Sequence, residues 1–146
     1  MKILFVCYAN LCRSPLAEVI AGTRFAERVE ARSAGISPAP GGPFEEALAV
    51  ARKLYGWDLS HHRPRHVLDS HPADFDYVIA LDSNVFIRLA RMPEIPSEKL
   101  FGWEITDPAG YGVETYEKVA RSLEKEIEKF VEAREREAAA SRPASN

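Results

Sequence analysis

The chain has 146 residues, of which 46% are hydrophobic and 28% are charged, with a formal charge of −3 at pH 7. This size fits one domain with an adequate core, and the slight negative charge argues against a nucleic-acid surface. The first apolar run, 3–7, is far too short to span a membrane and follows only Met1 and Lys2, so we expect neither a transmembrane helix nor a signal peptide. Both cysteines lie within 7–12, which leaves no disulfide framework and favours a reducing, cytoplasmic location.

Short apolar runs and helical stripes alternate along the chain. Strands are predicted at 3–6, 29–35, 75–81 and 99–103. Helices are predicted at about 16–28, at 45–55 with Gly56 as cap, after 82–84 as far as Arg91, and at 114–136. We expect a single domain over 1–137 and a frayed tail over 138–146.

The alternation of strands with helices predicts an α/β fold built on a parallel sheet. Such sheets bind ligands at the carboxyl ends of their strands. The segment between the first strand and the first helix lies at one of these ends, so it is the first place to look for a site.

That segment reads Cys7-Tyr8-Ala9-Asn10-Leu11-Cys12-Arg13-Ser14. A loop that enters a helix gathers backbone N–H groups and the positive end of the helix dipole, which suits a dianion such as phosphate. These surroundings also favour the thiolate form of a cysteine. Arg13 offers a planar fork for two phosphate oxygens, and Ser14 offers a hydroxyl that can stabilise a leaving thiolate. We therefore predict that Cys7 is a nucleophile that attacks phosphorus.

The string C-x-x-N-x-C-R-S-P-x-A-E, from Cys7 to Glu18, resembles the low-molecular-weight protein tyrosine phosphatases. The resemblance covers nearly the whole chain and implies a four-stranded parallel sheet with helices on both faces, a flavodoxin-like three-layer sandwich. It implies hydrolysis of phosphotyrosine or other aryl phosphate monoesters through a cysteinyl-phosphate intermediate, with Cys7 and Arg13 as catalytic residues. The loop residues expected to bind the substrate are Tyr8, Ala9, Asn10, Leu11, Cys12 and Ser14.

Asp107-Pro108 follows the last predicted strand and precedes the last predicted helix. Pro108 holds the residue before it extended, so the carboxyl group is presented from a fixed loop. In the phosphatases that this chain resembles, an Asp-Pro at this place supplies the general acid, and Asp107 matches it. The leaving oxygen needs a proton, and the same group can then activate water. The alternative is an aspartate that only caps a helix or a turn.

Asn10 lies where a tight loop favours a left-handed backbone, which asparagine tolerates. By resemblance, Ser33 in Ser-Ala-Gly and His62 in a His-x-x-Arg string that ends at Arg65 hold this asparagine. Ser33 could instead merely end a strand, and His62 could be a solvated loop residue. Arg65 and Asp82 match positions that the family tends to keep polar, and we interpret both as supports of the fold.

Cys12 allows two interpretations. It could pair with Cys7 on oxidation and so protect the nucleophile from irreversible over-oxidation. It could equally be a small buried residue that fills space. The sequence leaves both open, because only Cys7 has the position for catalysis.

Four histidines occur between 61 and 71. His62 and His66 have the i,i+4 spacing of a helical metal pair, but Pro64 lies between them and no nearby glutamate completes the pattern. We therefore expect no metal site, and we expect no cofactor.

The sequence is less specific about the substrate. A narrow pocket with aromatic walls selects aryl phosphates, and Tyr8 is one candidate wall. The related phosphatases commonly carry further aromatic residues after Ser33 and after the Asp-Pro, where this chain has 36–40 and Ala109-Gly110. Tyr111 is the candidate substitute. We expect a phosphotyrosine protein or a small aryl phosphate as substrate, no nucleic-acid or membrane partner, and a monomer or weak dimer.

Three alternative functions share parts of this pattern. Thioredoxin-coupled arsenate reductases have this loop but need further cysteines outside it, and here none follows Cys12. Protein-arginine phosphatases carry threonine before the second cysteine, where this chain has Leu11. A non-catalytic phosphate-binding module would have lost the nucleophile or the acid, whereas Cys7, Arg13 and Asp107 are all present.

Overall fold

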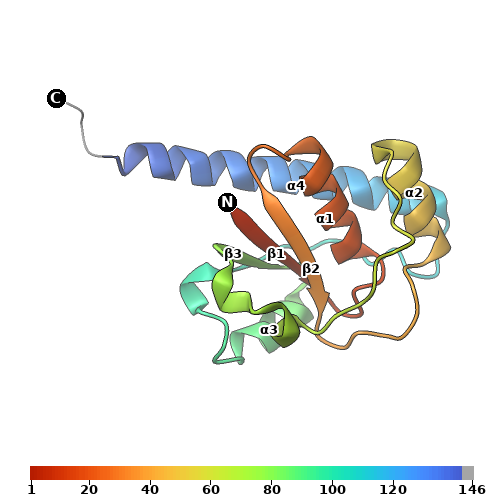
Figure 1. The fold of residues 1–146 in the computed structure, drawn as a ribbon, viewed down its shortest axis with the longest axis horizontal. Helices are drawn as coiled ribbons and strands as arrows, with labels where there is room; N and C mark the ends of the chain where they lie inside the picture. The colour runs from red at the N-terminus through yellow and green to blue at the C-terminus, as the bar shows by residue number, and fades with distance from the viewer. Residues whose placement is uncertain (143–146) are drawn as a thin grey trace.

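The computed structural model describes residues 1–142, which form a four-stranded parallel sheet with helices on both faces (Figure 1). The strand order is β2-β1-β3-β4. The strands are β1 (Lys2–Cys7), β2 (Glu30–Gly35), β3 (Tyr77–Ala80) and β4 (Leu100–Gly102). The predicted fold class is confirmed.

The described residues contain four α-helices, which are α1 (Arg13–Arg24), α2 (Glu45–Tyr55), α3 (Ser83–Ala90) and α4 (Val113–Ala140). Helices α1, α2 and α4 pack together on one face of the sheet, and α3 covers the other (Figure 1). Short 3-10 helices at Val67–Ser70, Pro72–Asp74 and Ser97–Lys99 lie in the connections. The sequence did not predict them, because a single turn is too short to show a helical period.

Strand β1 lies at the centre of the sheet and is buried on both faces. Ile3 and Phe5 belong to the core shared with α1, α2 and α4, while Leu4 and Val6 belong to the core shared with α3. Neighbouring residues of a strand point to opposite faces. An unbroken apolar run is therefore what a central parallel strand requires.

Helix α1 ends at Arg24 rather than at the predicted residue 28. Gly22 and Thr23, two poor helix formers, precede this end. The Thr23 hydroxyl also donates a hydrogen bond to the Val19 carbonyl at 2.8 Å, a local contact that weakens helix continuation. The chain thus leaves the helix a turn earlier than its apolar stripe predicted.

Helix α4 continues to Ala140, beyond the predicted end at 136, and its last turns extend past the sheet (Figure 1). Residues 138–140 are alanines, the strongest helix former. Propensity therefore continues the helix where the apolar stripe has stopped, so the start of the predicted frayed tail is helical. Residues 143–146 of that tail lie outside the described residues.

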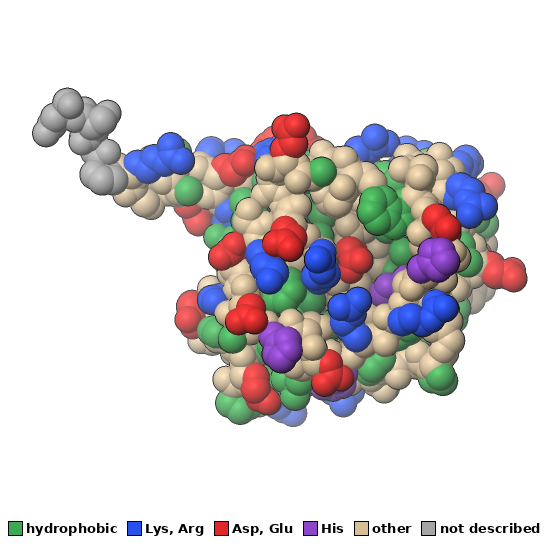
Figure 2. Space-filling model, viewed as in Figure 1, with side chains coloured by type: hydrophobic (Ala, Val, Ile, Leu, Met, Phe, Trp, Pro, Cys, Tyr) green, Lys and Arg blue, Asp and Glu red, His purple; other side chains and the backbone are tan. Residues whose placement is uncertain are grey.

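Within residues 1–142, no helix is both long and apolar enough to cross a membrane. On the face drawn in Figure 2, acidic and basic side chains are interspersed rather than grouped by sign.

The carboxyl ends of the parallel strands meet at one edge of the sheet. Cys7 ends β1 and Gly35 ends β2, while Asp82 follows β3 and Asp107 follows β4. The topology therefore gathers at one edge residues that are up to 100 positions apart in the chain.

Candidate active site

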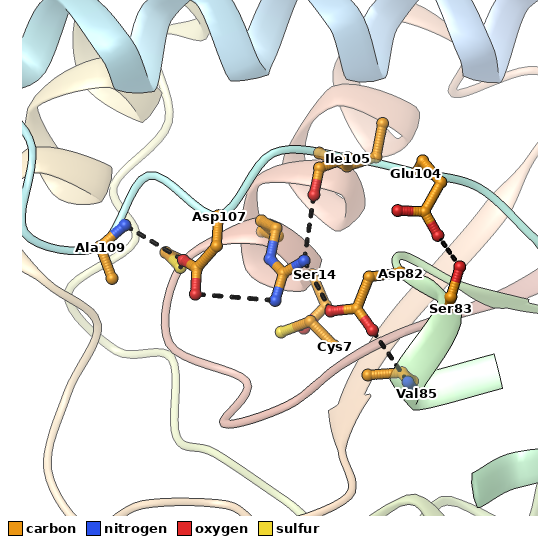
Figure 3. Close-up of polar contacts among 11 residues, drawn as sticks. Cys7, Ser14, Asp82, Ser83, Val85, Glu104, Ile105, Asp107 and Ala109 are labelled. Atoms are coloured by element: carbon orange, nitrogen blue, oxygen red, sulfur yellow. Dashed lines mark hydrogen bonds and ion pairs between the residues drawn. The ribbon is translucent and has the colours of Figure 1, made fainter. Parts of the chain in front are cut away.

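Cys7 lies where β1 gives way to the loop 8–12, which leads directly into α1. The residue is only 2% exposed, and its Sγ lies 2.9 Å from Ser14 Oγ. The positive end of the α1 dipole faces this point. Figure 3 shows Cys7 and Ser14 beside the carboxyl groups of Asp82 and Asp107.

Asn10 holds the loop in shape from its centre. It is fully buried with a left-handed φ of 59°, and its side-chain amide donates to Ser14 Oγ and Ser33 Oγ at 2.8 and 3.0 Å. Its side-chain oxygen accepts the Arg65 backbone N–H at 3.1 Å, and its carbonyl oxygen lies 2.8 Å from His62 Nε2. Ser33 and His62 thus contact Asn10, and Arg65 acts through its backbone.

His62 must donate to a carbonyl oxygen, so Nε2 carries a proton. Burial lowers the pKa of His62 below its ordinary value, which keeps the ring neutral at neutral pH. The neutral ring with its proton on Nε2 is the form that this contact needs.

The Ser14 hydroxyl links Asn10 to the sulfur of Cys7. Because the Asn10 amide donates to the hydroxyl oxygen, the hydroxyl proton is left for Cys7 Sγ at 2.9 Å or for the Ala34 carbonyl at 3.2 Å. An ionised sulfur is the stronger acceptor of the two. Ser14 is therefore placed to stabilise a thiolate at Cys7.

Arg13 is buried at the start of α1, with 5% of its side chain exposed. Its Nη1 donates to Asp82 Oδ2 at 2.9 Å and to the Ile105 carbonyl at 3.1 Å. Among the described residues, Nε has no hydrogen-bond partner, and Nη2 lies 3.9 Å from Asp107 Oδ2. Burial disfavours the charge, but the neighbouring Cys7, Asp82 and Asp107 outweigh it and raise the pKa of Arg13. The Nη1 side of the guanidinium is thus anchored, and its Nε–Nη2 edge can donate hydrogen bonds to an anion.

Asp82 does more than the fold support that the sequence predicted. Its Oδ1 caps α3 by accepting the Val85 N–H at 2.8 Å (Figure 3). Its Oδ2 accepts a hydrogen bond from Arg13 Nη1. Asp82 thereby orients the guanidinium relative to the sheet. The available signal was a carboxylate directly after a buried strand.

Asp107 reaches the same place from the loop that follows β4 (Figure 3). Its Oδ1 accepts the Ala109 N–H at 3.1 Å, and its side chain is 58% exposed. The backbone contact is the turn role that the sequence left open. Its Oδ2 nevertheless faces Arg13, so the carboxyl group lies at the entrance of the site.

Cys12 is a buried thiol that lies 3.9 Å from Asp107 Oδ1. Burial, reinforced by Cys7 and Asp107, raises the pKa of Cys12 to about 12. Cys12 is therefore a neutral thiol at neutral pH and a poor nucleophile. Both cysteines are free, and their pairing on oxidation stays a prediction.

A pocket of about 530 Å³ opens over Arg13 and Asp107. Its walls come from two loops and from α3, and they include Tyr8, Ile36, Asn84, Ile87 and Arg88. Tyr8, the predicted wall, is 51% exposed. Tyr111, the other aromatic candidate, follows a left-handed turn at Gly110 and is not among the residues that line this pocket.

Gly35, at the end of β2, lies against the loop backbone. A Cβ added there would come within 2.8 Å of the Tyr8 carbonyl oxygen and 3.0 Å of the Asn10 nitrogen. Only glycine allows this approach.

Ala9 and Leu11 are the two remaining loop residues that the sequence predicted to bind the substrate. Ala9 is half-buried. Leu11 is buried, and its carbonyl oxygen accepts the Phe44 N–H at 3.4 Å.

Within residues 1–142, no group of three or more histidine, cysteine or acidic side chains is placed to hold a metal ion.

A family model for the low molecular weight phosphotyrosine protein phosphatases matches residues 2–140. The chain belongs to this family. A solved low molecular weight protein tyrosine phosphatase from T. tengcongensis is similar, with 32% identity and a TM-score of 0.82 over 91% of this chain and 99% of that chain.

Relatives of this phosphatase family member carry other activities in their names. The YwlE arginine phosphatase from Geobacillus stearothermophilus has 27% identity and a TM-score of 0.82 over 99% of each chain. A glutaredoxin arsenate reductase from Synechocystis sp. is 28% identical over 131 residues, which cover 89% of this chain and 95% of the relative. Family membership alone therefore does not identify which substrate this chain acts on.

The sequence missed the part of this phosphatase site that comes from α3. Asn84, Ile87 and Arg88 line the pocket, but the predicted helix gave no reason to place one of its faces over the loop. The one hint was Ile87, an apolar residue outside the buried stripe, which is 49% exposed.

Proposed function

We propose that this chain is a phosphatase that hydrolyses phosphotyrosine or other aryl phosphate monoesters through a cysteinyl-phosphate intermediate. The observation that carries the proposal is a buried arginine beside a buried cysteine, whose Nε has no hydrogen-bond partner among the described residues and whose Nη2 has only Asp107 at 3.9 Å. A buried N–H without a partner is uncommon and calls for an explanation. A phosphate that bridges Nε and Nη2 would satisfy this edge with two charge-assisted hydrogen bonds.

In the first step, the Cys7 thiolate attacks phosphorus, and the bond from phosphorus to the leaving oxygen breaks. Arg13 holds phosphoryl oxygens throughout, which supplies orientation and charge stabilisation. Asp107, protonated at the start, gives its proton to the leaving oxygen. The products of this step are a phenol, cysteinyl phosphate and an Asp107 carboxylate.

In the second step, the Asp107 carboxylate takes a proton from water, and the oxygen of that water attacks phosphorus. The bond from sulfur to phosphorus breaks, which releases inorganic phosphate and returns the thiolate. The Ser14 hydroxyl, 2.9 Å from the sulfur, stabilises the departing anion. Asp107 is then protonated again for the next cycle.

Two features of the sequence favour hydrolysis of an aryl phosphate over the other activities that the relatives' names give. Leu11 stands where the arginine phosphatases carry threonine, and both cysteines lie in one loop, which leaves no third thiol in this chain for a reductase relay. The walls at Tyr8, Ile36 and Ile87 offer apolar surface to an aromatic ring. A thiol nucleophile also needs a reducing compartment, which supports a cytoplasmic location.

The test compares p-nitrophenyl phosphate, a phosphotyrosine peptide, phosphoarginine and arsenate, with EDTA present throughout and with a thiol reductant added to the arsenate assay to supply its two electrons. We expect turnover of the two aryl phosphates and inhibition by vanadate. Cys7→Ser should lower kcat by roughly 10⁴-fold or more while still binding phosphate in calorimetry. Cys12→Ser keeps the nucleophile and should keep measurable turnover. Faster turnover of phosphoarginine or arsenate, or an active Cys7→Ser, would refute the proposal.

A further inference from the structure

Helix α3 places one of its faces along the mouth of the pocket. Asn84, Ile87 and Arg88 are spaced i, i+3 and i+4, so their side chains share one face of the helix, and all three line the pocket. Tyr8 and Ile36 line the same pocket from the loops that follow β1 and β2. A bound substrate therefore has α3 on one side and these loops on the other.

The two arginines of this pocket differ in their surroundings. Arg13 is buried, is ion-paired with Asp82 and lies close to Asp107. Arg88 is exposed, and no carboxylate in residues 1–142 forms an ion pair with it. The mouth thus carries a cation whose charge the described part of the protein does not neutralise.

We propose that Arg88 selects peptide substrates that carry an acidic side chain next to the phosphorylated residue. The inference rests on the proposed function, in which Arg13 holds the phosphate. Arg88 would then be left for a second anion that lies outside the pocket floor. Ile87, 49% exposed on the preceding position, supplies an apolar surface for the substrate backbone or the stem of that acidic side chain.

The expected effect is modest because the pair would be exposed to solvent. Exposed ion pairs contribute little to binding, which corresponds to a preference of roughly two- to fivefold. The preference should appear mainly in KM, because the contact exists equally in the bound substrate and in the transition state. It should shrink as salt rises, because exposed charges are screened.

The experiment compares two phosphotyrosine peptides that differ only in glutamate or glutamine beside the phosphotyrosine. The ratio of their kcat/KM values is measured for the wild type, Arg88→Gln, Arg88→Glu and Arg91→Gln. Arg91 is a matched control, since it is an exposed arginine at the end of the same helix but outside the pocket lining. p-Nitrophenyl phosphate is assayed in parallel with the wild type.

We expect the wild type and Arg91→Gln to prefer the glutamate peptide, Arg88→Gln to have a ratio near one, and Arg88→Glu to prefer the glutamine peptide. An unchanged ratio in Arg88→Gln, or an equal loss in Arg91→Gln, would overturn the inference. Wild-type turnover of p-nitrophenyl phosphate with no preference between the peptides overturns this inference alone. Absence of turnover on every phosphate ester overturns the proposed function and this inference with it.

Discussion

Arg13 carries its charge almost entirely inside the protein, which is tolerated only when a buried ion is paired. Asp82 and the Ile105 carbonyl hold one side of the guanidinium, at 2.9 and 3.1 Å. These contacts fix one side of the guanidinium in advance, and a preorganised donor needs little reorganisation at the moment of reaction. The residue proposed to hold the phosphate is thus itself held by residues distant in sequence.

Asp107 can be tested as the general acid through the basicity of the leaving group. Asp107→Asn should lower kcat/KM for phenyl phosphate by roughly 10²-fold or more and by clearly less for p-nitrophenyl phosphate, whose leaving group needs less protonation. The measurement is kcat/KM of the variant relative to the wild type for each of the two substrates. This quantity reports on the first chemical step and not on hydrolysis of the intermediate.

Asp82→Asn provides the control for this experiment. It also removes a carboxylate beside Arg13, but Asp82 supplies no proton to the leaving oxygen. It should therefore lower kcat/KM by a similar factor for both substrates. An equal loss for both substrates in Asp107→Asn would contradict the acid role.

At the level of elements, the loop 8–12 depends on segments that pack against it. β2 supplies Ser33 and Gly35, and the 61–66 segment supplies His62 and the Arg65 backbone. The strand, loop and helix around Cys7 were predictable because they are contiguous in the chain. The end of α1 and the extension of α4 were not, because helix propensity decided them rather than the apolar stripe.

His62 should make stability depend on pH through the element that it anchors. Burial is the main cause of its lowered pKa, the Asn10 carbonyl and Glu18 oppose that shift, and Arg65 and Arg63 add to it. Above the ordinary histidine pKa the ring is neutral both folded and unfolded, so stability is full. As the pH falls through that value, the unfolded chain takes up a proton that the folded protein resists, and stability is lost.

The measurement is the free energy of unfolding in urea at pH 7.5 and pH 5. His62→Gln should show a smaller loss between these values than the wild type. His61→Gln removes a neighbouring ring that is 89% exposed and should keep the wild-type loss. If the two variants lose stability equally with falling pH, burial of His62 is not the cause.

At the scale of the whole molecule, two cores hold β1 between them. One lies under α1, α2 and α4, and the other lies under α3. Because the sheet is parallel, every connection returns across a face, and the strand ends collect at one edge. The site at that edge is therefore supported by both cores.

Leu123, fully buried in α4, tests the larger core. Leu123→Ala should lower the free energy of unfolding by about 2–5 kcal/mol, because it removes apolar contacts and leaves a cavity. Lys125→Ala, an exposed change two positions along the same helix, should stay within about 0.5 kcal/mol of the wild type. Similar denaturation midpoints for the two variants would show that α4 does not depend on this core.

The residues from Cys7 to Ser14 and the order of strands and helices followed from the sequence by itself. The physical reason is that a strand, a tight loop and a helix start are local, and each leaves its own pattern in neighbouring residues. Only the tertiary structure decided three other features. These are the ion pair between Asp82 and Arg13, the close approach of Gly35 to the loop, and the face of α3 that lines the pocket mouth. These contacts join segments far apart in the chain, and only the packing of both cores around a parallel sheet brings them together.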